Sequence, residues 1–208
     1  MIAIIDYGMG NIHSVKKALE SMGADTLVTN DPEQLVKAEK IVFPGVGAFG
    51  DAKLELEKTG MGRAIKECIR NNKVFLGICL GMQILFESSQ ESEGVEGLGI
   101  LKGYVKKFAN TGLKVPHMGW NQLKKVASGQ SSVVSECPLL KNIPDNSYVY
   151  FCHSYYPAPF DGNVVAAATD YGLSFASVVW QGNVFGVQFH PEKSQKTGLS
   201  ILNNFVAL

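Results

Sequence analysis

The first part of the chain alternates short apolar runs with segments of helical spacing, and this alternation constrains the fold more than any other feature. The apolar runs are Ile2–Asp6, Lys40–Phe43 and Val74–Ile78. The segments of helical spacing are 12–22, 49–58, 62–71 and 80 to about 88. Continuous apolar runs are typical of strands that are buried on both faces. The alternation therefore predicts an α/β fold, a three-layer sandwich with helices on both sides of a mostly parallel central sheet.

The second part of the chain has several strand-like runs and few helical ones. These runs are 103–108, 122–126, 148–151, 164–168, 174–180 and 184–189. Their close spacing favours antiparallel hairpins, so we expect them to extend the parallel sheet. A last helix is expected after Ser194, a possible N-cap, with Leu199, Leu202, Phe205 and Val206 on its apolar face. Without a repeat or a linker, we expect residues 1–208 to form a single domain.

Charge and cysteine content exclude several classes of protein. Lys+Arg and Asp+Glu both number 19, so the chain has no basic excess for nucleic acid. No apolar stretch is long enough to span a membrane, and the start of the chain lacks the basic region of a signal peptide. The four cysteines show no CxxC spacing, which argues against a metal site. We expect a cytoplasmic protein with free thiols and with no cofactor, metal, nucleic acid or membrane partner.

Cys79 lies in the segment Gly77–Gly81, where the predicted strand runs directly into a predicted helix. This is the cysteine version of the nucleophile elbow, a turn so tight that its flanking residues must be small. The turn lifts the sulfur to the carboxyl edge of the sheet and places it at a helix N-terminus, which favours thiolate. The N–H of Leu80 could then bind an oxyanion. A small buried hydrophobe is the alternative reading of Cys79, and Cys152 is the rival nucleophile.

The predicted strand 184–189 delivers His190-Pro191-Glu192. His190 would carry protons between the sulfur and a leaving group, and Glu192 would orient and stabilise its imidazole ring. By itself, His-x-Glu is also compatible with a surface ion pair, whereas metal ligation lacks an evident third ligand. His153 could substitute as the base, but no nearby carboxylate in the sequence would orient it.

Two segments together resemble the signature sequences of the class I (triad) glutamine amidotransferases: 77–83 (Gly-Ile-Cys-Leu-Gly-Met-Gln) and 186–192 (Gly-Val-Gln-Phe-His-Pro-Glu). Four more segments resemble the glutaminases that serve imidazole glycerol phosphate synthases in histidine biosynthesis. They are 4–11, 44–49, 116–121 and 151–155. The resemblance implies that glutamine is hydrolysed to glutamate and ammonia. It also implies a heterodimer with a (β/α)8-barrel cyclase, which uses the ammonia to form imidazole glycerol phosphate and aminoimidazole carboxamide ribotide.

The resemblance implies roles for individual residues. Cys79, His190 and Glu192 match the catalytic triad. The residues matched to the oxyanion and glutamine contacts are Leu80, Val46, Gly47, Gln83, Glu91, Ser154 and Tyr155. The residues matched to the cyclase interface are Asn11, Trp120, Tyr150 and Lys193. Segment 44–47 is expected to supply the second oxyanion donor, and its glycines make a peptide flip easy. The subunit alone is therefore expected to have low activity until the cyclase holds its substrate.

Three other interpretations stay open at the level of sequence. The first is a glutaminase that serves a different enzyme, such as pyridoxal phosphate synthase. The second is a degenerate amidotransferase fold that acts only as an interaction module, although all three triad positions are present. The third takes Gly8-Met9-Gly10 as a nucleotide-binding loop, but the third glycine of G-x-G-x-x-G is missing.

Overall fold

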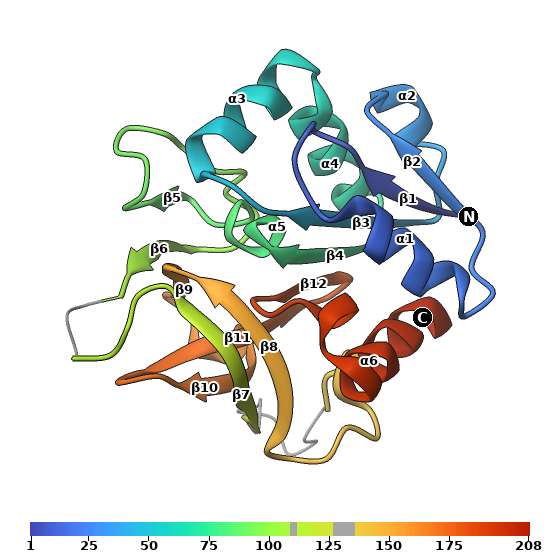
Figure 1. Cartoon of the computed structure of the whole chain (residues 1–208). Helices are drawn as coiled ribbons and strands as arrows, with labels where there is room; N and C mark the ends of the chain where they lie inside the picture. The colour runs from blue at the N-terminus through green and yellow to red at the C-terminus, as the bar shows by residue number, and fades with distance from the viewer. Residues whose placement is uncertain (109–111, 127–135) are drawn as a thin grey trace.

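The computed structural model describes residues 1–108, 112–126 and 136–208 (Figure 1). Two sheets occur within these residues. The strands of the larger sheet are β1 (Ile2–Ile5), β2 (Thr26–Thr29), β3 (Lys40–Gly45), β4 (Val74–Cys79), β7 (His117–Lys125), β8 (Ser147–His153), β10 (Val165–Asp170), β11 (Ser174–Gln181) and β12 (Val184–Val187). The strands of the smaller sheet are β5 (Ser88–Ser89), β6 (Gly103–Lys107) and β9 (Tyr155–Pro159).

The larger sheet changes from parallel to antiparallel along its width. Its order is β2-β1-β3-β4-β12-β11-β10-β7-β8. Pairing is parallel from β2 through β12 and antiparallel from β12 through β8. The expected parallel sheet with an antiparallel extension is confirmed. The strand β12 joins the two halves, because it pairs in parallel with β4 and antiparallel with β11.

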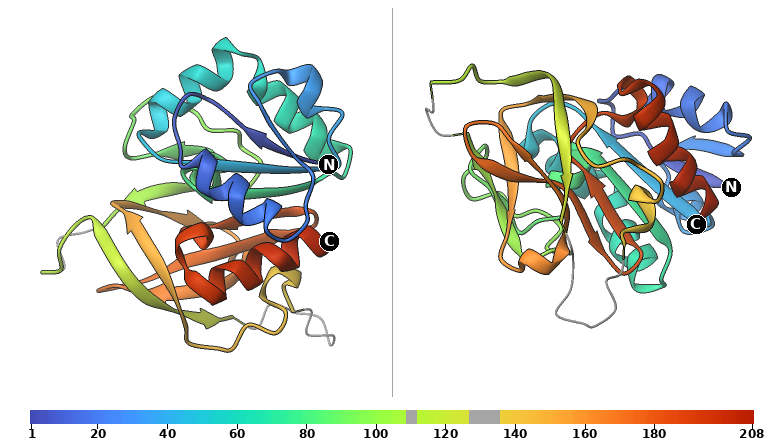
Figure 2. Two further views of the ribbon diagram at one scale, coloured as in Figure 1. Left: turned by 45° about the vertical axis from the view of Figure 1, so that its right-hand side comes forward. Right: turned by 90° about the horizontal axis from the view of Figure 1, so that it is seen from below.

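Helices cover both faces of the parallel half. On one face α1 (Ile12–Glu20) and α6 (Gln195–Ala207) lie side by side, and on the other lie α2 (Pro32–Leu35), α3 (Phe49–Lys58) and α4 (Met61–Arg70) (Figures 1 and 2). The position of β1 between the two helical layers explains why its sequence is continuously apolar. Ile2 and Ile4 enter the core beneath α1 and α6, whereas Ala3 and Ile5 enter the core beneath α2, α3 and α4. Successive strand residues point to opposite faces, so both faces must be apolar.

The helix expected from residue 80 to about 88 is much shorter, because α5 spans only Leu80–Gln83. Backbone N–H groups of residues 98–101 donate to the carbonyls of residues 84–86. Residues 98–101 thus occupy carbonyl groups that would accept hydrogen bonds within a longer helix. The strands β2 and β9 were not predicted, since polar or proline-containing residues interrupt their apolar character.

Ser194 precedes α6 as expected, but its side chain does not cap the helix. Its hydroxyl donates to the carbonyl of His190 (2.6 Å) and accepts the N–H of Tyr150 (2.9 Å). The predicted apolar face of α6 is also partly wrong, because Leu199 is exposed. The buried face is Gly198, Ile201, Leu202 and Phe205. Gly198 belongs to it because a Cβ there would lie 1.9 Å from a backbone oxygen of Pro191. In the described part of the chain, no helix has the length and apolar character needed to cross a membrane.

Candidate active site

Cys79 ends β4 and immediately precedes α5, so the strand passes into the helix without a connecting loop. Its backbone has φ 54° and ψ −108°, in a region that non-glycine residues rarely occupy. Such strain is often found where a side chain must be held in a particular position for function. The predicted strand-to-helix turn at Cys79 is therefore confirmed as a feature of the backbone.

The two glycines around Cys79 are required by close backbone contacts. A Cβ on Gly77 would lie 2.3 Å from the carbonyl oxygen of Gly81, and a Cβ on Gly81 would lie 1.9 Å from the carbonyl oxygen of Phe43. Backbone cannot move aside as a flexible side chain can. The expectation that both flanking positions must be small is confirmed, and its physical reason is contact with the turn itself and with β3.

The parallel pairing of β12 with β4 brings His190 to Cys79. Val187 lies opposite Ile78, so the residues that follow each strand reach the same edge of the sheet. The Nδ1–H of His190 donates to Oε1 of Glu192 over 3.0 Å, and both side chains are nearly completely buried. Burial lowers the pKa of His190, but hydrogen bonds with Cys79 and Glu192 outweigh it and raise that pKa to about 10. The imidazole therefore favours its protonated form and can hold a proton for a leaving group.

Gln188 also contacts the sulfur, and sequence reasoning gave it no role. Its Nε2 donates to Sγ of Cys79 over 3.6 Å. Its Oε1 accepts from Nε2 of Gln83 (3.1 Å), which in turn donates to the carbonyl of Tyr155 (2.9 Å). This arrangement fixes which end of the Gln188 amide faces the sulfur. A polar side chain just after the apolar strand β12 was the signal that could have identified it.

A cavity of about 290 Å³ lies beside Cys79. This volume is near the lower end of typical small-molecule sites. Every residue that the resemblance matched to oxyanion or glutamine contacts lines it. The lining residues are Val46, Gly47, Cys79, Leu80, Gln83, Glu91, Pro116, Cys152, His153, Ser154, Tyr155, His190 and Lys193. Glu91 also stabilises the start of α3, because its Oε2 accepts the N–H of Phe49 (2.8 Å).

The residues matched to the cyclase interface lie near this cavity or on an exposed surface. Lys193 lines the cavity, and Nδ2 of Asn11 donates to Oε1 of Glu192 over 3.3 Å. Trp120 and Tyr150 face one another across β7 and β8 with their rings 6.1 Å apart. Trp120 is 46% exposed. Their contact with a cyclase stays a prediction.

His153, the rival base, is engaged at both ring nitrogens. Its Nδ1 donates to the carbonyl of Tyr155 (2.8 Å), and its Nε2 lies 3.0 Å from Nδ1 of His117. Burial is the main cause that lowers the pKa of His153 to about 3. A base so weak and so fully bonded is poorly suited to proton transfer. Cys152, the rival nucleophile, also lines the cavity, and its carbonyl oxygen lies 4.0 Å from Sγ of Cys79.

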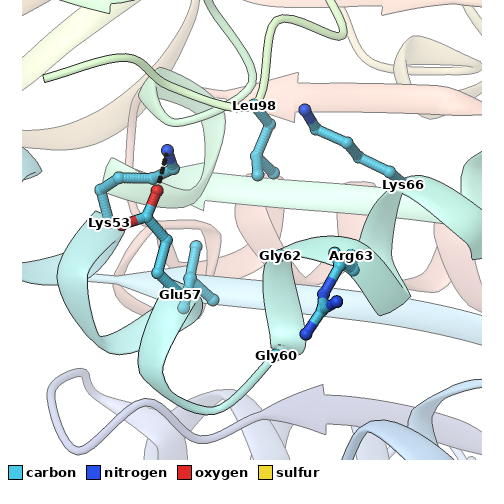
Figure 3. Close-up of a pocket in the computed structure, with 8 residues that line it drawn as sticks. Lys53, Glu57, Gly60, Gly62, Arg63, Lys66 and Leu98 are labelled. Carbon is cyan, nitrogen blue, oxygen red and sulfur yellow. Dashed lines mark hydrogen bonds and ion pairs between the residues drawn. The ribbon is translucent and has the colours of Figure 1, made fainter.

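A second cavity, of about 400 Å³, lies between α3 and α4 (Figure 3). Lys53 pairs with Glu57 along α3 (2.8 Å), and the cations Arg63 and Lys66 come from α4. None of the residues that line this cavity, all of them described, is a cysteine, serine or histidine. Although it is larger, it lacks the nucleophile and base that the cavity beside Cys79 brings together.

Comparisons with known proteins agree over the full length of the chain. Residues 3–208 match the family model for class-I glutamine amidotransferases. A relative from Acinetobacter baylyi is 48% identical over 206 residues, which cover 99% of this chain and 97% of the relative. A relative from Methanocaldococcus jannaschii is 48% identical over 208 residues and both chains are fully covered, at 100%. Both relatives are named imidazole glycerol phosphate synthase subunit HisH.

Solved structures of lower identity show the same fold. One is a crystal structure of a glutamine amidotransferase, with a TM-score of 0.73 and 17% identity, covering 99% of this chain and 100% of that one. Another is PurLQS from Thermotoga maritima, with a TM-score of 0.76 and 19% identity, covering 99% and 97%. At this level of identity, the likeness concerns the fold alone.

Proposed function

The chain belongs to the class-I glutamine amidotransferases, and from this membership we propose that it is the glutaminase subunit of an imidazole glycerol phosphate synthase in histidine biosynthesis. The observation that carries the proposal is the single cavity that Cys79 and His190 share, with Glu192 bonded to the far side of His190. The choice of this synthase rests on the names of the two relatives. Residues 1–208 would act as one amidotransferase domain.

In the proposed reaction, the sulfur of Cys79 attacks the side-chain carboxamide carbon of glutamine. A C–S bond forms, the C–N bond breaks, and His190 gives its proton to the departing ammonia. The product is a γ-glutamyl thioester. His190 then takes a proton from water, whose oxygen bonds to the thioester carbon. The C–S bond breaks, which releases glutamate and returns Cys79 with a protonated His190 beside it. Glu192 accepts from Nδ1 of His190 throughout, so that Nε2 remains available for these transfers.

The negative oxygen of the tetrahedral intermediate needs backbone donors. Leu80 opens α5, and N–H groups in the first turn of a helix have no partner within that helix. The second donor would come from segment 44–47, of which Val46 and Gly47 line the cavity. One such donor typically changes the rate by roughly 10²–10³-fold. The orientation of one peptide in this segment could therefore control turnover.

A barrel-type cyclase is the proposed partner, and exposed apolar side chains of β7 support a protein interface there. Met118 is 61% exposed and Trp120 46% exposed. Apolar groups gathered in this way often mark interaction sites. Lys193 and Asn11 would lie at the same interface, close to the triad. The cytoplasmic location expected from the sequence stays a prediction.

The deciding experiment measures ammonia release from glutamine by the full chain, alone and with a barrel cyclase, with and without the ligand of that cyclase. The proposal expects a large increase when the cyclase and its ligand are both present. A pyridoxal phosphate synthase subunit serves as the comparison partner. Activation by that subunit instead would favour the alternative glutaminase, and no glutamine hydrolysis with any partner would favour the non-catalytic module.

A further inference from the structure

The hydroxyl of Tyr7 binds both polar backbone groups of Val46, which is 39 residues away in the chain. Its O–H donates to the carbonyl of Val46 (2.8 Å), and the N–H of Val46 donates to its oxygen (2.9 Å). Tyr7 is only 4% exposed, and its ring packs edge-to-face on Phe43 with 5.2 Å between centroids. Burial raises the pKa of Tyr7 above its ordinary value, so the hydroxyl keeps the proton that it donates.

Val46 occupies the position from which a second oxyanion donor would come. Gly45 ends β3 directly opposite Cys79 in the parallel register, and Val46 follows it into the lining of the cavity. A backbone residue has one N–H. In this structure the N–H of Val46 is directed at Tyr7, which is not among the residues that line the cavity. The N–H of Val46 is therefore already engaged by the Tyr7 hydroxyl and is not free to bind an oxyanion.

The loop after β1 lies close to segment 44–47 at two further places besides Tyr7. A Cβ added to Gly47 would lie 3.2 Å from the sulfur of Met9, and one added to Gly10 would lie 3.5 Å from the carbonyl oxygen of Pro44. Gly47 has φ +98°, a conformation in which glycine is nearly free of strain. Segment 44–47 can thus change its backbone conformation, and the buried side chain of Tyr7 holds it in the present one.

We propose that Tyr7 is a positioning residue that holds the N–H of Val46 away from the oxyanion, so that efficient glutamine hydrolysis requires the hydrogen bond from this N–H to Tyr7 to break. This inference rests on the proposed function and deepens it, since it names the side chain that keeps the subunit nearly inactive when alone. A hydroxyl that merely supported the folded loop would have the opposite effect, because its removal would lower activity.

Tyr7→Phe tests the inference, because it removes the hydroxyl and keeps the ring that packs on Phe43. The full chain is assayed alone and with the cyclase and its ligand. We expect kcat of the chain alone to rise roughly tenfold, the change that loss of one or two neutral hydrogen bonds produces. KM should change less than twofold, and the activation by the cyclase should fall by the same factor as kcat rises. An equal or lower kcat for the chain alone would overturn the inference.

Hydrogen exchange at the Val46 amide gives a second readout that needs no activity. We expect faster exchange in Tyr7→Phe than in the wild type, and unchanged exchange would overturn the inference even if the glutaminase function holds. Tyr171→Phe is the matched control, because Tyr171 also donates to a backbone carbonyl, that of Lys114 (2.7 Å), outside this segment. If no variant hydrolyses glutamine with any partner, the proposed function fails, while the exchange experiment still decides the contact between Tyr7 and Val46.

Discussion

The side-chain amide of Gln188 donates a hydrogen bond to the sulfur of Cys79, with 3.6 Å between Nε2 and Sγ. Gln188 is completely buried, and Gln83 holds the other end of its amide. A neutral donor next to a thiolate stabilises the negative charge without competing for the proton of His190. The sulfur thus has a hydrogen-bond donor besides His190. His190 can give its proton to a leaving group, whereas the amide of Gln188 keeps its proton.

Gln188→Leu should lower kcat/KM for glutamine by roughly 10–100-fold, because hydrogen bonds to charged groups contribute about 1.5–3 kcal/mol. The rate at which iodoacetamide alkylates Cys79 at neutral pH should fall as well. Gln181→Leu, on the exposed end of β11, is the matched control and should leave both rates unchanged. An unaltered alkylation rate in Gln188→Leu would show that the amide does not stabilise the thiolate.

Cys79→Ser separates the proposed chemistry from a structural role. The hydroxyl of serine is a far weaker nucleophile than a thiolate, so glutamine-dependent synthesis by the complex with the cyclase should be abolished. Synthesis from added ammonium should remain close to that of the wild-type complex, because the cyclase is unaltered. Both activities are measured on the same preparation. Loss of both would mean that Cys79 is needed for the structure of the complex rather than for hydrolysis.

Gly81→Ala should destabilise the protein by about 3 kcal/mol or more, at the upper end of the range for overpacking. The new Cβ would lie 1.9 Å from the carbonyl oxygen of Phe43, in a strand that cannot withdraw. Urea unfolding measures the change. Gly162→Ala is the matched control, since a Cβ there meets nothing within 4 Å, and its unfolding free energy should be nearly unchanged. Equal stability of the two variants would contradict the close packing at the elbow.

His117 and His153 should make the fold sensitive to acid. Burial lowers the pKa of His117 to about 4, and burial is also the largest cause that lowers the pKa of His153 to about 3. In the unfolded chain both titrate near 6.5, so the unfolded state binds more protons between these values. Their stabilisation is present above about pH 6.5 and is lost as the pH falls toward 4 and 3.

Each of these histidines should remove about 2 kcal/mol of unfolding free energy between pH 7 and pH 5. Urea unfolding at the two pH values measures this loss. His117→Gln should reduce the loss by about 2 kcal/mol, because this group no longer titrates. His13→Gln, at an exposed position of α1, should behave as the wild type. The same pH dependence in His117→Gln and the wild type would mean that His117 does not contribute.

The sequence was sufficient for the features that depend on local pattern. Continuous apolar runs predicted the parallel half of the sheet, because a strand covered on both faces must be apolar on both. Two glycines around a cysteine predicted the strand-to-helix turn, because such a turn leaves no room for side chains. The resemblance of short segments placed Val46, Gln83 and Tyr155 at one site, and all three line the cavity beside Cys79.

Tertiary structure decided what depends on residues distant in the chain. The helix after Cys79 ends at Gln83, because residues 98–101 return and bind its next carbonyls. The register of β12 against β4 brings His190 to the sulfur, and no local pattern could give that register. Gln188 and Tyr7 were missed for the same reason. Their roles come from hydrogen bonds to Cys79 and Val46, and a hydrogen bond requires a distance and a direction that only the folded chain supplies.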